Sequence, residues 1–495
     1  MDEAGRELLD LLDGLPLALA QAASYIYETE LDTASYVRLY KQQWDDLMRS
    51  DGESSSPLVD YKQGSVGTTW MVSFKAVEAN NKNAANLLRL WAFVDNRDLW
   101  RGLLQAAADG GEQWPGWLRE IAGSEVRYLD AARLLRRYSM IEDGESVWGG
   151  YMMHPVVHRW ASHIQDGTAK KAVLQLAVLL VGFSVPSRTT KDYWVVLRRL
   201  LPHAERCSWW IGEIYREGRS FDDKTVLGAM NRLGYLYADQ DRLTEAESIY
   251  GRALEGCEKV LGQDHISTLD TVNSLGNLYN NQGRLTEAES MYQRALEGCE
   301  RVLGQDHIST LDTVHNLGVL YNNQGRLTEA ESMYQRALEG CEKVLGQDHI
   351  STLDTVNNLG VLYKNQGRLT EAESMYQRAL EGCERVLGQG HISTLNTVHN
   401  LGVLYNNQGR LTEAESMYQR ALEGYERVLG QGHISTLYTV NSLGILYNNQ
   451  GRLTEAESMF HRALSGFQTA LGPSHWKSLL VVRNMDLLHN VKGIP

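Results

Sequence analysis

Histidine and cysteine recur along the C-terminal half of the chain, and both residue types bind metal ions. The histidines stand 42 residues apart, at His265, His307, His349, His391, His433 and His475. The cysteines keep the same period, at Cys257, Cys299, Cys341 and Cys383, and Tyr425 replaces the next one. A zinc site needs three or four clustered ligands, which this spacing does not supply. We therefore expect no metal site: the histidines pack in loops, and the cysteines fill the core.

The sequence also lacks the groups that a catalytic site requires. No Gly-x-x-x-x-Gly-Lys-Ser/Thr string occurs, and the chain contains no Gly-Lys pair at all. Without this loop there is no amide cradle for phosphates, no phosphate lysine and no Mg²⁺ hydroxyl. No nucleophile–base pair stands out either. We therefore expect a non-catalytic protein with no cofactor of its own.

The composition narrows the class further. The chain has 495 residues and a formal net charge of −14, so its length predicts several domains or a repeat array. The acidic balance argues against nucleic-acid and membrane-surface partners. No run of about eighteen apolar residues could cross a membrane, and residues 1–6 do not begin a signal region. Five unclustered cysteines suit a reducing compartment, so we expect a cytoplasmic protein.

A repeat of 42 residues organises the second half of the chain. The string Gly-Arg-Leu-Thr-Glu-Ala-Glu recurs at this spacing, after a variant at Asp241, from Gly283, Gly325, Gly367, Gly409 and Gly451. Six units therefore fill residues 226–477 and contain 27 of the 45 glycines. A fixed period of this length is typical of a solenoid.

Each unit predicts two helices. In the unit from Thr268, apolar residues recur at helical spacing as far as Tyr279. We expect Ser267 to cap this first helix, and Thr286 with Glu289 to form a capping box at the start of the second.

The helix pair resembles the tetratricopeptide repeat. The matching residues are Leu275, Gly276, Tyr279, Ala288, Tyr292, Ala295 and Leu296. The usual repeat has about 34 residues, and the additional stretch, residues 300–307, resembles the kinesin-light-chain type of unit. The resemblance implies a mainly α fold with a right-handed α-solenoid, whose first helices line a concave groove.

The copies differ mainly on one face of their first helices. Positions 270, 273, 277 and 280 share this face, whereas the second helices stay nearly identical between copies. Asparagine suits a peptide backbone because its amide both donates and accepts hydrogen bonds. We predict that a peptide or protein partner binds to Asn231, Asp270, Asn273, Asn277, Asn280, His315, Asn316, Asn322, Asn357, Asn358, Lys364, His399, Asn400, Asn406 and Asn441. The alternative is a merely solvated face on which Asp270 acts only as an N-cap.

Charge changes along the array. The first three units carry about −3 each, the next two −1 each and the last +1. We therefore expect a bound segment with basic residues toward the N-terminal half of the array.

The N-terminal 225 residues differ in composition and hold 11 of the 12 tryptophans. Residues 14–18, Gly-Leu-Pro-Leu-Ala, are similar to a motif of the NB-ARC signalling NTPases, which belong to the STAND and NOD-like receptors. Residues 153–155, Met-His-Pro, resemble the Met-His-Asp motif of these proteins in its fungal form. The resemblance implies that Pro16 packs near the adenine and that His154 touches the β-phosphate of ADP.

A winged-helix region is predicted between these two motifs. Residues 126–138 predict a helix. Residues 139–141 and 147–153 predict the two strands of a wing, with the turn at Asp143-Gly144.

These features predict five segments of the chain. They are a helical Gly-Leu-Pro-Leu-Ala segment (1–60), a winged-helix-like domain (61–165), a helical linker or degenerate repeat (166–225), the six units (226–477), and a capping helix with its tail (478–495). Because the phosphate-binding loop is missing, we expect the regulatory, C-terminal part of an NB-ARC-type receptor, naturally truncated or wrongly started. ADP or ATP would bind only together with an upstream domain.

Two other functions are compatible with parts of the sequence. One is a cargo or scaffold adaptor that resembles kinesin light chain, although no heptad coiled coil precedes the array. The other is DNA binding through Arg133, Arg136 and Arg137 of the winged helix, which the net charge of −5 over residues 1–225 disfavours.

Overall fold

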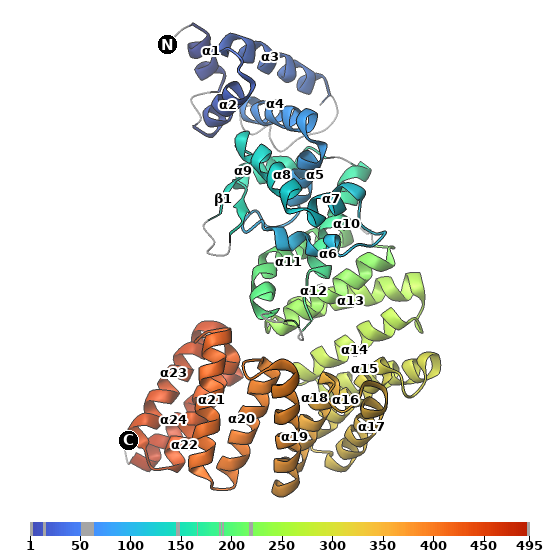
Figure 1. The fold of residues 1–495 in the computed structure, drawn as a ribbon, viewed down its shortest axis with the longest axis vertical. Coiled ribbons are helices and arrows are strands. Elements are labelled where there is room, and N and C mark those ends of the chain that lie inside the picture. Colours follow the sequence, from blue (N-terminus) through green and yellow to red (C-terminus); the bar gives the residue numbers. More distant parts are fainter. Residues whose placement is uncertain are drawn as a thin grey trace. The chain divides into compact units, whose positions relative to one another are not determined.

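The structure is a computed structural model that describes residues 3–12, 16–50, 64–144, 149–165, 167–187, 190, 193–216 and 221–492. It divides into two compact units: the first comprises residues 1–186 and 195–260, and the second comprises residues 187–194 and 261–495. Both are built almost wholly from helices (Figure 1). Gly14 and Leu15 of the predicted N-terminal motif, and the boundary predicted at residue 60, lie outside the described residues.

The first unit contains the single-copy part of the sequence and one repeat. Its elements are α1 (Glu3–Leu11), α2 (Pro16–Thr29), α3 (Thr33–Ser50), α4 (Gly64–Asn80), α5 (Lys82–Trp91), the 3₁₀ helix η1 (Arg101–Leu104), α6 (Gln105–Ala108), α7 (Gly116–Gly123), α8 (Glu125–Arg137), β1 (Glu142–Asp143), β2 (Tyr151–Met152), α9 (Pro155–His163), α10 (Gly167–Phe183), α11 (Tyr193–Arg216), α12 (Lys224–Asp239) and α13 (Leu243–Leu261).

Helix α2 begins inside the Gly-Leu-Pro-Leu-Ala motif, at Pro16, and packs on α4 and on the end of α8. Gln21 donates a side-chain hydrogen bond to the Ser139 carbonyl, and the hydroxyls of Ser24 and Ser139 lie 2.7 Å apart. Ser139 has a φ of 51°, which non-glycine residues adopt rarely. These two contacts therefore hold a strained turn at the end of α8.

The wing is smaller than the sequence predicts. The helix predicted at residues 126–138 is present as α8, but residues 139–141 form no strand. The first strand is β1, which pairs antiparallel with β2 through Glu142 opposite Met152 and Asp143 opposite Tyr151. The predicted turn at Asp143-Gly144 is therefore wrong, because Asp143 is still paired; residues 145–148 lie outside the described part.

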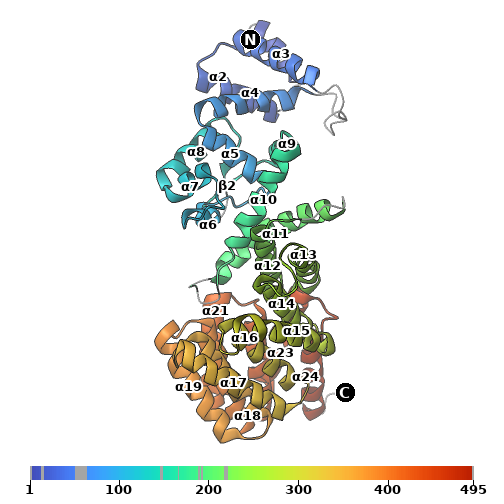
Figure 2. The ribbon, with the colours of Figure 1, turned by 90° about the vertical axis from the view of Figure 1, so that its right-hand side faces the viewer.

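The second unit is a row of helix pairs, which Figure 2 shows from a second direction. Each pair has a first helix of 16 residues and a second of 19. In order, the helices are α14 (Ile266–Asn281), α15 (Leu285–Leu303), α16 (Ile308–Asn323), α17 (Leu327–Leu345), α18 (Ile350–Asn365), α19 (Leu369–Leu387), α20 (Ile392–Asn407), α21 (Leu411–Leu429), α22 (Ile434–Asn449), α23 (Leu453–Leu471) and the final α24 (Trp476–Lys492).

The repeated glycines let the two helices of a unit approach closely. A Cβ atom on Gly276 would lie 2.6 Å from the ring of Tyr292, and one on Gly298 would lie 2.4 Å from Leu269. Both distances are too short for a side chain, so glycine is required for this packing. Tyr292 and Ala288 are fully buried at the same interface.

The predicted caps of both helices are wrong. The first helix starts one residue after His265, whose Nδ1 accepts a hydrogen bond from the Ser267 amide at 3.1 Å. The histidine is thus the N-cap, because its ring nitrogen satisfies an amide that the helix leaves free. Thr286 lies inside the second helix, and Glu289 accepts instead from Arg326 of the next unit at 2.7 Å.

Two further features concern the described residues as a whole, 3–12, 16–50, 64–144, 149–165, 167–187, 190, 193–216 and 221–492. Within them, no helix has the length and apolarity needed to cross a bilayer. The same residues contain no group of three or more histidine, cysteine, aspartate or glutamate side chains that could hold a metal ion.

Candidate ligand-binding face

The first helices of the second unit, α14, α16, α18, α20 and α22, form one continuous surface, which we call the first-helix face. Each of these helices contacts the next one more extensively than the second helices contact each other. Helices that approach most closely lie on the inner side of a bend, so the first-helix face is the inner side of the array.

Three carboxylates follow one another along this face, and all three side chains are exposed: Asp270, Asp312 and Asp354. The surrounding protein removes solvating water and raises the pKa of the Asp270 and Asp312 carboxyls above the usual value. The charge of Asp270 raises the pKa of Asp312 further, and the N-cap histidines oppose these shifts. Among the described residues, no lysine or arginine pairs with Asp270 or Asp312. The face therefore exposes negative charge that water solvates poorly.

We call Asp270, Asp312 and Asp354 the acidic run. It ends at α20, where Asn396 takes the place of the aspartate. The facing residue on the second helix changes too: the cysteine of the earlier units becomes Tyr425, whose hydroxyl donates to Asn396 Oδ1. In the unit of Asp270 this cysteine is Cys299. Its burial raises the pKa of the thiol to about 11, and the charge of Asp270 adds to the effect. That cysteine is thus a protonated, buried packing residue, as the sequence predicts.

Several predicted ligand contacts instead join neighbouring units. Asn316 Nδ2 donates to Asn273 Oδ1, and Asn400 Nδ2 to Asn357 Oδ1, at 3.2 Å each. Asn441 Oδ1 accepts from Asn484 Nδ2 at 3.0 Å. The amides at these positions are half-buried or buried, so their first role is to hold the register between units.

A second row of amides has the same arrangement about two helical turns further along. Each amide oxygen accepts a bond of 3.0–3.1 Å from the following unit, in the pairs Asn280–Asn323, Asn322–Asn365 and Asn406–Asn449. Asn277 instead accepts from the Tyr292 hydroxyl at 2.8 Å. These bonds explain why asparagine recurs at positions that the sequence assigns to a ligand.

The two predicted histidines differ in how fully they are bonded. The ring of His315 contacts Thr355 Oγ1 at 3.0 Å and accepts from Asn358 Nδ2 at 3.1 Å, so both nitrogens are used. His399 contacts Thr439 Oγ1, but its buried Nε2 has no partner among the residues described. Serine stands at 442 where the earlier unit has Asn358, and a hydroxyl cannot reach as far as an amide. Burial lowers the pKa of each histidine to about 4, so both are neutral at pH 7.

Lys364 is the one predicted contact on this face that carries a positive charge. It is half-buried on α18, where burial lowers the pKa of its ammonium group. Its charge contributes to the lowered pKa of His399, so the two side chains are near neighbours. Lys364 and His399 together form a polar region beyond the acidic run.

The remaining predicted site residues lie in the first unit. Asn231 is half-buried on α12, and its buried Oδ1 has no partner in the described part of the chain. Pro16 is exposed at the first position of α2. His154 is the N-cap of α9, and its Nδ1 accepts from the Val156 amide at 3.3 Å. His154 therefore has a structural role that requires no nucleotide.

Helix pairs stacked in one direction define an α-solenoid. A sequence model of the tetratricopeptide repeat matches residues 225–301, 267–343, 309–385, 351–427 and 393–469, which together span α12 to α23. The array therefore consists of tetratricopeptide repeats.

A fungal relative shares part of this sequence. A nucleotide-binding leucine-rich repeat (NLR)-like protein of Hyaloscypha variabilis is 29% identical over 280 residues. The match covers 54% of this chain and 26% of the relative, so the chain spans about a quarter of the relative's length.

Two solved structures are similar in fold. Kinesin light chain TPR-like repeats of Podosopora anserina share 23% identity with a TM-score of 0.35, over 42% of this chain and 98% of that one. A STAND protein with a tetratricopeptide repeat sensor from Pyrococcus horikoshii shares 12% identity with a TM-score of 0.46, over 97% of this chain and 70% of that one.

Proposed function

We propose that this chain is a non-catalytic interaction and sensor module that binds a basic peptide or protein segment along the first-helix face. The observation that carries the proposal is the pair Asp270 and Asp312, two exposed carboxylates with raised pKa values that no lysine or arginine pairs with among the described residues. An ammonium or guanidinium group of a ligand would supply the missing partner.

The rest of the face suits the backbone of such a segment. Asn273, Asn357 and Asn441 each use one acceptor site for the neighbouring unit. Each side-chain amide has two donors and two acceptor positions, so hydrogen-bonding capacity remains for an extended chain. His399 Nε2 adds a neutral acceptor beside the positive charge of Lys364. We infer that basic residues of the ligand lie over α14–α18 and that neutral or acidic residues lie beyond them.

The wider role that we propose is the regulatory half of an NB-ARC-type signalling receptor, located in the cytoplasm and without a cofactor of its own. The sequence similarity to an NLR-like protein supports it, as do the two motifs in the first unit. A kinesin-light-chain-like cargo or scaffold adaptor would use the same face. Hydrogen–deuterium exchange separates the two roles: in a sensor, ligand binding also changes the exchange of α8 and α9, whereas in an adaptor it changes the first-helix face alone.

A peptide titration tests the binding site itself. Matched peptides containing lysine or glutamine at the same positions are added to the full chain, and affinity is measured by fluorescence anisotropy at low and high salt. We expect the lysine peptides to bind at least about tenfold more tightly at low salt. The variant Asp270→Asn/Asp312→Asn/Asp354→Asn should remove most of this preference.

The array offers a control with the same change in charge. Glu297, Glu339 and Glu381 are exposed at equivalent positions of three second helices. The variant Glu297→Gln/Glu339→Gln/Glu381→Gln should keep the preference for lysine peptides. Equal affinity for lysine and glutamine peptides, or an equal loss in both variants, would refute binding at the acidic run.

A further inference from the structure

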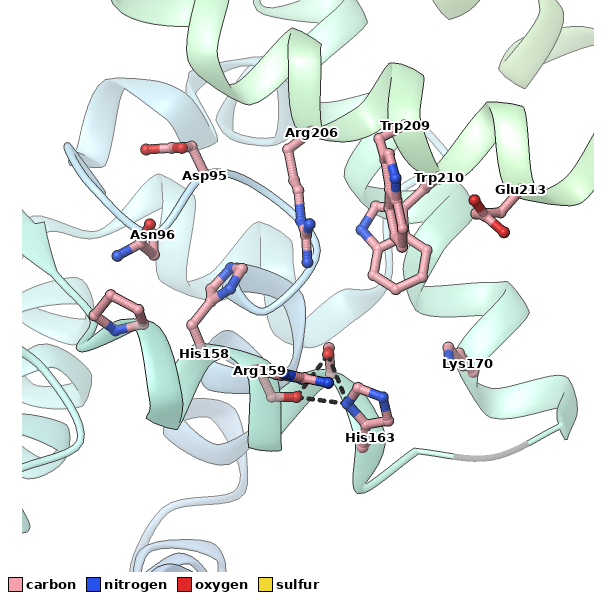
Figure 3. Close-up of a pocket in the computed structure, with 12 residues that line it drawn as sticks. Asp95, Asn96, His158, Arg159, His163, Lys170, Arg206, Trp209, Trp210 and Glu213 are labelled. Carbon is pink, nitrogen blue, oxygen red and sulfur yellow. Dashed lines mark hydrogen bonds between the residues drawn. The ribbon is translucent and has the colours of Figure 1, made fainter. Parts of the chain in front are cut away.

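A cavity of about 640 Å³ lies within the first unit, among α9, α10, α11 and the loop after α5. Its charged lining residues are Asp95, Arg159, Lys170, Arg206 and Glu213. Figure 3 shows Arg206 extending from α11 toward α9, beside the rings of Trp209 and Trp210. Cavities of several hundred Å³ have the size of small-molecule binding sites.

Each of the two acidic lining residues pairs with an arginine that does not line the cavity, and the charge of Asp95 also acts on Arg206, whose pKa it raises. Asp95 Oδ1 pairs with Arg97 at 3.2 Å, and Glu213 Oε1 pairs with Arg216 at 2.5 Å. By contrast, Arg159, Lys170 and Arg206 form no ion pair within the part of the chain that the structure describes. The cavity therefore has an excess of positive charge, although the protein as a whole carries −14.

Arg206 is the most constrained of the three cations. Its Nε is buried without a hydrogen-bond partner among the described residues, and burial lowers the pKa of its guanidinium group. The group lies over two indole rings, 4.9 Å from the Trp209 centroid and 5.1 Å from that of Trp210. Stacking fixes the plane of the guanidinium and leaves its N–H groups to an outside acceptor.

We propose that this cavity binds a small organic phosphate that carries a planar ring, with the phosphate held by Arg159, Lys170 and Arg206 and the ring against Trp209. A phosphate group brings about two negative charges and several acceptor oxygens, which suits three cations that form no ion pair among the described residues. The Trp209 side chain remains 49% exposed at the rim, so one aromatic surface is available for stacking. Neither Pro16 nor His154 lines this cavity, and no residue of the first-helix face does.

Titration calorimetry on the full chain tests the site with AMP, adenosine and inorganic phosphate as probes. We expect saturable AMP binding with a dissociation constant below about 1 mM, and binding at least about tenfold weaker for adenosine and for phosphate alone. Phosphate that binds as tightly as AMP would overturn the assignment of a ring. Adenosine that binds as tightly as AMP would overturn the assignment of a phosphate, and no binding of AMP would overturn the site.

Variants locate the binding within the cavity. Arg159→Gln/Arg206→Gln should weaken AMP binding at least about tenfold, because each substitution removes a charge-assisted hydrogen bond. Trp209→Leu should weaken AMP binding but leave phosphate binding unchanged. The control Arg119→Gln changes an exposed arginine of the same unit that does not line the cavity. Circular dichroism confirms that each variant is folded, and equal AMP affinity in a folded double variant would overturn the proposal.

Discussion

The two sides of the repeat array differ in how completely their polar groups are satisfied. On the second helices, one glutamate per unit bonds an arginine of the next unit at 2.7–2.9 Å, in the pairs Glu289–Arg326, Glu331–Arg368, Glu373–Arg410 and Glu415–Arg452. On the first-helix face, His399 Nε2 and the carboxylates of Asp270 and Asp312 have no such partner in the described residues. The near-identical second helices, which we call the identical side, therefore hold the units together through ion pairs. The first-helix face, which we call the variable side, joins the units through its asparagines and, under the proposed function, keeps additional bonding capacity for a ligand.

Removing one glutamate from the identical side should have the largest effect on stability. Burial alone would raise the pKa of Glu331, but hydrogen bonds from Gln366 and Arg368 hold it below its usual value. Glu331→Ala leaves the Gln366 amide without its acceptor and leaves Arg368 with Glu371 and Gln366 only. We expect a cost of about 1–2 kcal/mol for this partly exposed pair. Thermal unfolding should show a lower Tm. Glu339→Ala on the exposed side of the same helix is the control, and an equal Tm in both variants would contradict the holding role of Glu331.

The sequence predicts the identical side well in outline and poorly in detail. A period of 42 residues locates every helix pair, because each glycine and alanine of the interface recurs in register. The capping box at Thr286 and Glu289 fails because the glutamate bonds a residue 37 positions away, in the next unit. Local spacing carries no information about such a partner. The sequence predicts the repeated histidines as loop residues and misses their role as N-caps, because histidine is not a typical cap.

The sequence predicts even less about the contacts on the variable side and about the cavity. The spacing of positions 270, 273, 277 and 280 predicts a shared face, but it does not reveal that Asn273 bonds Asn316 of the next unit. Only the stacking of two units brings these amides within reach. The cavity is invisible in the sequence because Asp95, Arg159 and Arg206 come from three separate segments. The excess charge emerges only once the outside partners of Asp95 and Glu213 are known.

An asparagine at position 442 should supply the hydrogen-bond donor that His399 Nε2 lacks on the variable side. Ser442→Asn places in α22 the residue that serves His315 in the earlier unit, where Asn358 donates to Nε2 at 3.1 Å. The new amide should reach His399 Nε2 and raise the stability by about 0.5–1 kcal/mol, the net value of one hydrogen bond. The reverse change, Asn358→Ser, should lower the stability by a similar amount. Thermal unfolding measures both, and a lower Tm for Ser442→Asn would contradict the assignment of a free acceptor at His399.

We expect the smallest change in stability from removing a charge of the acidic run, and this change depends on pH. The pKa of Asp312 is raised above the usual 3.8, so the folded state binds this proton more tightly than the unfolded state does. The charged carboxylate therefore destabilises the fold at pH 7, and this destabilisation disappears as the pH falls through the raised pKa. Asp312→Asn should be slightly more stable than the parent chain at pH 7, and the difference should shrink as the pH falls through the raised pKa toward the usual 3.8.

Asp306 is the control for Asp312, because its carboxylate does have a basic partner. Asp306 pairs with Lys343 at 2.6 Å, so Asp306→Asn should leave the stability at pH 7 unchanged or slightly lower. Adding a lysine peptide should reverse the order for Asp312, since the ligand's cation then stabilises the carboxylate that asparagine lacks. Thermal unfolding gives the Tm of each protein under four conditions, at pH 7 and at pH 4, with and without peptide. A stability gain from Asp312→Asn that persists at pH 4 would show that charge is not its cause, and the acidic run would lose its role as the part of the face that selects a basic ligand.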